Sequence, residues 1–154
     1  MQMKKLSTKS ILEFIGILGI IGSVVFVGIE VRQNSSIARA ASYQSYIYGF
    51  TQLNLAQVTD DELNSLMVRI EKGASTSDLT PEQRRKIVFF YITLLRQWEG
   101  LYRSVNEGIL PDEMLTIVGA GHLLSYPAFI EVWPEVRPLF TEDFARFVDD
   151  VHNR

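Results

Sequence analysis

The residues that could support acid–base or metal chemistry are few in this chain of 154 residues. His122 and His152 are its only histidines, and neither has a local partner at metal-ligand spacing. The absence of cysteine excludes disulfides, thiolate metal sites and a cysteine nucleophile. The remaining candidates are paired carboxylates, at Asp60-Asp61-Glu62, Asp112-Glu113 and Asp149-Asp150.

These acidic groups have a structural interpretation that competes with catalysis. Two of the three fall in the first turns of expected helices, where the helix dipole favours negative charge. Gly119-Ala120-Gly121 follows no expected strand and lacks the third glycine or lysine of a phosphate-binding loop. No nucleophile with an adjacent base is recognisable. The sequence therefore predicts no catalytic residue, no metal and no cofactor, and an enzyme is the least favoured functional class.

Three aromatic residues offer a different kind of site. Tyr91, Trp98 and Tyr102 recur at helical spacing and could line an apolar pocket between helices. The same spacing is typical of a helix face buried in a core, so both interpretations stay open. Nucleic acid is not an expected partner, because the net charge is −3 and Arg84-Arg85-Lys86 is the only basic cluster.

An apolar run near the N-terminus is the main feature of the sequence. Residues 11–29 contain a single charge, that of Glu13. At about 1.5 Å per residue, a helix of this length spans roughly 28 Å, close to the hydrocarbon thickness of a bilayer. Because the run is apolar on all faces, a buried helix of a soluble protein is disfavoured. Ser10 and Glu13 have the spacing of a capping box, which predicts that the helix starts at Ser10.

Two interpretations of this run involve a membrane. In a cleaved signal peptide, Lys4, Lys5 and Lys9 would form the basic region and Ala38-Arg39-Ala40 the cleavage site. That site lies far beyond the apolar run, after a polar stretch, so an uncleaved signal-anchor is favoured. The predicted parts of the chain are a basic tail (1–9), a transmembrane signal-anchor helix (10–31) and a helical domain (32–154).

The charges that flank the span favour one orientation. Three lysines and the terminal amine precede the span, whereas only Arg32 and Arg39 follow it closely. The excess of positive charge places the N-terminus in the cytoplasm. In a bacterium, the span would then lie in the inner membrane and the helical domain in the periplasm.

Two groups of residues in and beside the span could contact partners. Gly16, Gly19 and Ser23 are small, and small residues let two membrane helices approach closely, although glycine is also common in membrane helices that do not associate. Arg32-Gln33-Asn34 forms a polar collar after the span that could contact lipid headgroups or a partner. A snorkelling interfacial arginine is a sufficient explanation of Arg32.

Helix start and stop signals occur along the rest of the chain. No glycine or proline lies between Ile29 and Gly49, so the membrane helix is expected to continue outward to about Gln57. Thr59 and Thr80 each open a capping-box pattern. Gly73 and Gly108 are the expected stops of the two helices that follow.

The C-terminal third is also expected to be helical. Helices are predicted from Pro111, from Pro127 to Trp133 and from Thr141, with a turn bracketed by Pro134 and Pro138. Two pairs at i, i+4 spacing, Glu82 with Lys86 and Glu99 with Arg103, are expected on the longest of the domain's helices. The predicted fold is all-α, with an extended N-terminal transmembrane helix joined to a bundle of four or five further helices.

Several short motifs occur in a characteristic order. The Arg32-Gln33-Asn34 collar is followed by Arg39-Ala40 and Gln44, and later landmarks are Leu79-Thr80-Pro81, Trp98-Glu99-Gly100, Glu107-Gly108-Ile109 and Leu139-Phe140-Thr141. In this order the chain resembles a widespread family of uncharacterised bacterial single-pass membrane proteins with an N-terminal anchor and a C-terminal helical domain. Gly100 departs from the polar residue expected at its position. The resemblance implies a bacterial, membrane-anchored protein and transfers no catalytic residue.

Two functional hypotheses follow from the sequence. In the first, the chain is a membrane-anchored helical interaction or accessory protein that binds a protein partner or self-associates through its anchor. In the alternative, it is a membrane-anchored domain that senses a ligand or lipid in a pocket between helices. Its expected partners are the lipid bilayer and either a protein or a second copy.

Overall fold

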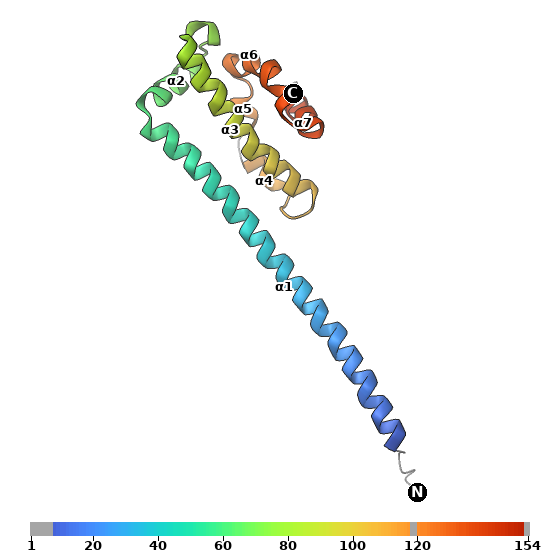
Figure 1. The fold of residues 1–154 in the computed structure, drawn as a ribbon. Coiled ribbons are helices and arrows are strands. Elements are labelled where there is room, and N and C mark those ends of the chain that lie inside the picture. Colours follow the sequence, from blue (N-terminus) through green and yellow to red (C-terminus); the bar gives the residue numbers. More distant parts are fainter. Residues whose placement is uncertain (1–7, 118–119, 153–154) are drawn as a thin grey trace. The chain divides into compact units, whose positions relative to one another are not determined.

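The computed structural model describes residues 8–117 and 120–152 of the protein. All regular structure in these two ranges is helical, which confirms the predicted all-α class. The elements are α1 (Thr8–Thr59), α2 (Asp61–Glu71), α3 (Pro81–Asn106), α4 (Glu113–Ile117), α5 (Ala120–Leu123), α6 (Pro127–Val136) and α7 (Glu142–His152), with 3-10 turns at Thr76–Asp78 and Arg137–Leu139 (Figure 1). Lys4, Lys5 and Gly119 lie outside the described residues. The chain divides into two compact units, residues 1–40 and residues 41–154.

Helix α1 supplies all of the described structure of the first unit. It runs from Thr8 to Thr59, which confirms the expected continuation beyond the apolar run. The predicted capping role of Ser10 is wrong, because Ser10 already lies inside the helix. Glu13 instead forms an exposed pair with Lys9, whose Nζ lies 4.0 Å from Glu13 Oε1.

The second unit has helix starts and stops that follow local side-chain chemistry. The Thr80 capping box is confirmed: Thr80 Oγ1 accepts a hydrogen bond from the amide of Gln83, and Gln83 Oε1 accepts one from the amide of Thr80. The expected cap at Thr59 is wrong, because Asp60 caps α2 by accepting from the amide of Leu63 at 3.0 Å. Gly73 follows the C-cap residue Lys72 of α2 and has a φ of 92°, in the left-handed region that glycine adopts without strain.

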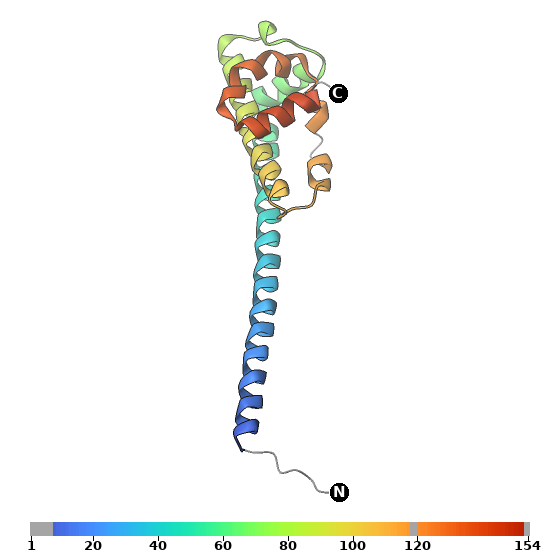
Figure 2. The ribbon, with the colours of Figure 1, turned by 90° about the vertical axis from the view of Figure 1, so that its right-hand side faces the viewer.

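The core of the second unit is built mainly on α3. Helices α2, α6 and α7 all contact α3, and Figure 2 shows α6 and α7, in orange and red, against α3 in yellow. Tyr91 and Phe129 are almost completely buried, and their rings meet edge to face with centroids 5.4 Å apart. Phe144 and Val148 bring α7 into the same core.

Two details of the C-terminal third correct the predictions. Helix α6 continues to Val136, so Pro134 lies inside it instead of opening a turn. Pro134 is the eighth residue of this helix, and because proline has no N–H it cannot donate the helical hydrogen bond to the carbonyl oxygen of Ile130.

Both predicted i, i+4 pairs on α3 are replaced by contacts with other elements. Lys86 donates to Asp60 and Glu62 near the start of α2 instead of pairing with Glu82. Glu99 accepts from Arg96 and Thr141 instead of Arg103. Long charged side chains on a surface helix can reach neighbouring elements, and helical spacing alone does not indicate which partner they choose.

Candidate interaction surfaces

The first candidate surface is the apolar part of α1 in the first unit. The large apolar side chains from Leu12 to Ile29 are each more than half exposed. An 18-residue window of α1 has a mean hydropathy of 2.4, and none of it is buried. By length and composition, this helix could cross a membrane. A side-chain surface so apolar and so extensive requires cover by lipid or by protein.

The predicted small-residue positions lie on this surface. A Cβ atom added at Gly16 or Gly19 would meet no atom within 4 Å, so both are open to an approaching helix. The Ser23 hydroxyl donates to the carbonyl oxygen of Gly19 at 2.8 Å. Because its own helix satisfies this hydroxyl, burial of Ser23 in lipid or against a second helix leaves no unpaired donor.

The predicted collar remains exposed. Arg32, Gln33 and Asn34 all lie within α1, and their side chains face solvent. Within residues 8–117 and 120–152, none of the three side chains has a hydrogen-bond partner. Their donors and acceptors are therefore available to lipid headgroups or to another protein.

The second candidate surface is an apolar groove in the second unit, between residues 46–54 of α1 and helix α3. The groove has a volume of about 310 Å³. Its lining is mostly apolar and comes from α1, α3, α4 and α5: Tyr46, Ile47, Phe50, Asn54, Leu94, Trp98, Leu101, Met114 and Leu123. A volume of this size falls at the lower end of the range for small-ligand sites.

Close contacts between α1 and α3 hold the two walls of this groove together. The hydroxyl groups of Tyr46 and Ser104 lie 3.0 Å apart and share a hydrogen bond. A Cβ atom on Gly100 would lie 3.2 Å from Tyr46 Oη, so glycine leaves the space that Tyr46 occupies. This contact gives a physical reason for the glycine that replaces the expected polar residue.

The structure does not bring the three predicted pocket residues together. Trp98 lines the groove, but Tyr91 is completely buried in the core against Phe129. Tyr102 is half-buried and contacts Phe144 and Phe147 of α7. Tyr91, Trp98 and Tyr102 share one face of α3, but Tyr91 and Tyr102 are separated by roughly 16 Å along the helix axis, so they meet different neighbours.

One polar atom of Trp98 and one of Tyr91 are buried without a hydrogen-bond partner in the described residues. They are the indole N–H of Trp98 and the hydroxyl of Tyr91. Burial raises the pKa of the Tyr91 hydroxyl, so the group stays neutral. Unpaired buried donors carry a desolvation cost, which makes the neighbourhood of Trp98 receptive to an acceptor group.

A third surface was missed by the sequence analysis. On residues 41–59 of α1, the side that packs on the bundle carries the partly buried residues Tyr46, Phe50 and Leu53. On the opposite side lie five exposed residues, here called the outer face: Gln44, Tyr48, Thr51, Leu55 and Val58. Tyr48 and Val58 are 67% and 71% exposed. The signal was present in the sequence, since no charged residue occurs from Ala40 to Thr59.

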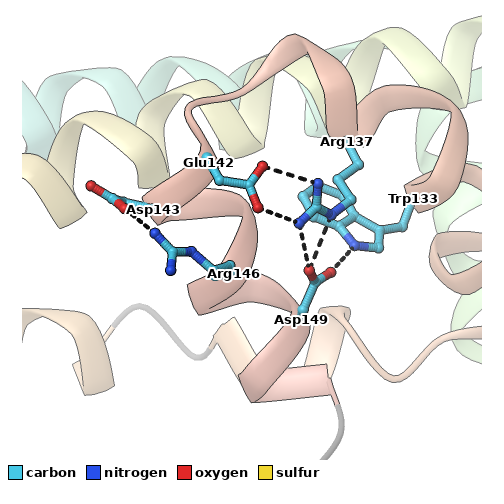
Figure 3. A network of polar contacts seen from close by, with 6 residues as sticks. All are labelled: Trp133, Arg137, Glu142, Asp143, Arg146 and Asp149. Atoms are coloured by element: carbon cyan, nitrogen blue, oxygen red, sulfur yellow. Dashed lines mark hydrogen bonds and ion pairs between the residues drawn. The ribbon is translucent and has the colours of Figure 1, made fainter.

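Two of the three acidic groups from the sequence analysis contribute carboxylates that bind other parts of the fold, Asp60 and Asp149. Asp149 accepts from the indole N–H of Trp133 at 2.7 Å and from Arg137, and Arg137 also donates to Glu142 (Figure 3). Burial opposes the charge of Asp149, but these bonds outweigh it and lower the pKa of its carboxyl group. Asp60 is likewise held by the Leu63 amide and Lys86, which lower the pKa of its carboxyl group. These acids join α7 to α6 and cap α2.

Glu99 is a further bound carboxylate and is 8% exposed. Its Oε1 accepts from the amide and hydroxyl groups of Thr141, at 2.7 and 2.8 Å, and its Oε2 accepts from Arg96 at 2.7 Å. Burial raises the pKa of Glu99, but these hydrogen bonds outweigh it and the net pKa is lowered. Glu99 therefore fixes the start of α7 on α3.

The two histidines occupy separate structural positions. His122 Nε2 lies 3.1 Å from the hydroxyl of Tyr126, and His152 Nδ1 lies 3.1 Å from the carbonyl oxygen of Leu124. In the residues that the structure describes, no three histidine or acidic side chains converge at a possible metal site.

Comparison with known proteins adds no family to these observations. No protein-family model, no curated protein and no solved structure matches the chain. The resemblance to bacterial single-pass membrane proteins stays a prediction from sequence motifs, and the candidate surfaces rest on the chemistry of the chain itself.

Proposed function

We propose that the chain is a membrane-anchored helical interaction protein, held in a bacterial inner membrane by α1. The single observation that carries the proposal is the exposed apolar stretch from Leu12 to Ile29, in which no side chain is covered by the rest of the chain. Transfer of this surface from water to lipid is strongly favourable, at roughly 25 cal/mol per Å². A soluble protein would expose this surface at a high risk of aggregation.

The orientation follows from flanking charge. Lys4, Lys5 and Lys9 precede the stretch, and Arg32 and Arg39 follow it. This distribution supports a cytoplasmic N-terminus and a periplasmic helical domain. A reporter enzyme fused after Arg154 tests the orientation. Activity of a periplasmic reporter is expected, whereas activity of a cytoplasmic reporter at the same position would contradict it.

An interaction role fits the second unit better than catalysis. The acidic side chains Asp60, Glu99 and Asp149 are engaged in fold-stabilising bonds, while apolar side chains are exposed on α1. Proteins use such exposed apolar surface for binding. In this proposal the anchor restricts the protein to the membrane surface, and the helical domain presents a contact for a protein partner or for a second copy.

Cross-linking in native membranes tests this role. A tagged full-length chain is cross-linked, extracted and purified, and the products are identified by mass. We expect a defined cross-linked product containing either a second copy or one reproducible partner. Recovery of the chain only as an uncross-linked monomer, at cross-linker concentrations that capture a known membrane complex, would contradict the proposal.

The groove beside Trp98 favours a second candidate function, the binding of an apolar ligand such as a lipid acyl chain. The supporting observation is the combination of an apolar lining with the unpaired indole N–H of Trp98. A long-chain acid would supply both an apolar tail and an acceptor oxygen.

Fluorescence quenching tests this candidate with dibromostearic acid as the probe. Saturable quenching of the full-length chain is expected, together with its loss in the groove-filling variant Leu94→Phe. Variant Val68→Phe adds the same ring at an exposed position outside the groove and serves as the control. Quenching that rises linearly with the probe and is equal in all three chains would contradict a defined site.

A further inference from the structure

The outer face of α1 has the composition of a protein interface and the spacing of a helix pair. Gln44, Tyr48, Thr51, Leu55 and Val58 follow one another at intervals of four, three, four and three residues. This is the spacing by which one face of a helix meets a partner helix in a coiled coil. The residues are exposed and lie opposite the side of α1 that packs on the bundle.

The absence of charge is the unusual property of this surface. The 20 residues from Ala40 to Thr59 contain no lysine, arginine, aspartate or glutamate. Solvated helix faces normally carry charged residues, whereas interface centres are depleted in them and enriched in tyrosine. Tyr43 and Tyr48 are both exposed within this stretch. The surface thus has the chemistry of a protein interface, but no other segment of the described chain covers it.

The shape of the surface indicates what could cover it. A hollow on α1 is lined by Tyr43, Gln44, Ile47, Tyr48, Thr51 and Gln52. Four of these residues, at positions 44, 47, 48 and 51, have the arrangement of a hole that accepts one side chain from a facing helix. In a parallel pair of identical helices in register, the side chain that enters this hole is Tyr48 of the second copy.

We propose that the outer face of α1 pairs with the same face of a second copy of this chain, in parallel and in register. The proposal rests on the proposed membrane anchoring, because two chains inserted in one membrane share one orientation. In such a pair, each residue lies close to its own counterpart, so any charge on the face would meet a like charge. The uncharged stretch avoids this repulsion.

The polar residues of the face do not oppose pairing. The Thr51 hydroxyl donates to the carbonyl oxygen of Ile47 at 2.8 Å, so its own helix satisfies it on burial. Gln44 carries an amide that can bond to the amide of its counterpart. A face of this length is short for a stable dimer in solution. Anchoring in one membrane raises the effective concentration of the two copies and compensates for this short length.

The natural absence of cysteine allows a direct test on the full-length chain in membranes. Single variants Tyr48→Cys and Leu55→Cys are oxidised, and disulfide-linked dimers are quantified by gel. Ser45→Cys and Ala56→Cys are the matched controls, since both residues are exposed but lie beside the outer face. Because a disulfide requires closely spaced Cα atoms, we expect about five-fold more dimer from each of the two outer-face variants than from each control variant.

A second experiment compares two chains that carry the same cysteine, so differences in cysteine reactivity between positions do not affect it. Tyr48→Glu with Leu55→Glu is made in a chain carrying Thr51→Cys. The added charges would face their counterparts, so the yield of disulfide dimer is expected to fall about ten-fold relative to Thr51→Cys alone. Because these side chains are exposed, the melting temperature of the helical domain should not change.

Three results would overturn the pairing. The first is an equal yield of disulfide-linked dimer at all four cysteine positions, and the second is no dimer at any position in chain that is inserted in the membrane. The third is that a bifunctional cross-linker attached to the Tyr48→Cys variant captures only a different protein. Each of these leaves the chain in the membrane fraction and so spares the proposed anchoring. Recovery of the unsubstituted chain as a soluble protein would contradict the anchoring itself and remove the basis for parallel pairing.

Discussion

The N-terminal apolar helix and the C-terminal helical unit use similar side chains in opposite ways. In the first unit, Phe14 and Val24 are each more than 60% exposed. In the second, Phe129 and Val132 are almost completely buried. The difference lies in their distribution: residues 14–29 are apolar on every face of the helix, whereas α7 confines Phe144 and Val148 to one side. The first distribution leaves the apolar side chains uncovered by the chain, whereas the second buries them in a core.

Charge placed in the apolar stretch of the first unit should have the largest effect. Variant Ile20→Arg with Val24→Arg adds two charges near the centre of the apolar stretch. Each arginine costs about 2.5–3.5 kcal/mol on insertion scales, so their sum of about 5–7 kcal/mol should abolish stable insertion. The fraction of the chain that resists carbonate extraction measures the effect. Variant Ile20→Leu with Val24→Leu should remain membrane-bound, and retention of the arginine variant would contradict the expected anchoring.

Truncation of one aromatic side chain in each unit compares a buried ring with an exposed one. Phe129→Ala removes a ring that contacts Tyr91 and Trp133, and it should lower the free energy of unfolding by about 3–5 kcal/mol. Phe14→Ala removes an exposed ring and should leave the unfolding of the second unit unchanged. Denaturant unfolding of the full-length chain in detergent measures both. Equal losses would indicate that Phe14 has a protein partner within the fold.

The buried acid Glu99 gives the stability of the second unit a dependence on pH. Its folded pKa lies below its ordinary value, so its stabilising contribution is present above the unfolded pKa of about 4.3 and is lost as the pH falls through the folded pKa. Glu99→Gln keeps an acceptor for Thr141 but loses the charge. It should cost about 1–2 kcal/mol at pH 7 and much less at pH 3.

Urea unfolding at the two pH values measures this difference. Glu113→Gln is the control, because Glu113 is exposed. A loss of stability in Glu99→Gln that is equally large at both pH values would show that the Glu99 charge is not what holds Thr141 and Arg96.

The smallest expected change in stability distinguishes the two sides of α1 within the second unit. Tyr46→Phe removes the hydrogen bond to Ser104 and should cost about 1 kcal/mol. Tyr48→Phe alters an exposed outer-face hydroxyl and should not affect stability. A double-mutant cycle of Tyr46→Phe with Ser104→Ala isolates the bond. Additive losses would mean that the two hydroxyl groups do not interact.

Sequence patterns predicted the helices well because helix formation is local. The Thr80 capping box and the Gly73 stop depend on neighbouring residues, and both occur as expected. The continuation of α1 beyond the apolar run was predicted from the absence of glycine and proline between Ile29 and Gly49. Local chemistry failed where a longer-range partner competed, as at Lys86, which bonds to Asp60 and Glu62 at the start of α2.

The candidate surfaces were less predictable. Trp98 lines the groove, whereas Tyr91 is buried in the core and Tyr102 lies against α7, because helical spacing does not reveal which neighbour each position along a helix meets. The groove itself depends on how α1 lies on α3, which the contact of Tyr46 with Gly100 and Ser104 fixes. The outer face could have been found from the uncharged stretch, once the structure had indicated which side of α1 is exposed.

Membrane association of the unsubstituted chain is the most direct test of the anchoring on which the proposed function depends. The full-length protein is expressed in a bacterium, and the cell membranes are washed with alkaline carbonate and floated on a density gradient. The exposed apolar stretch from Leu12 to Ile29 predicts that the chain floats with the membranes after the wash. Recovery of folded, monomeric chain in the soluble fraction would contradict the account.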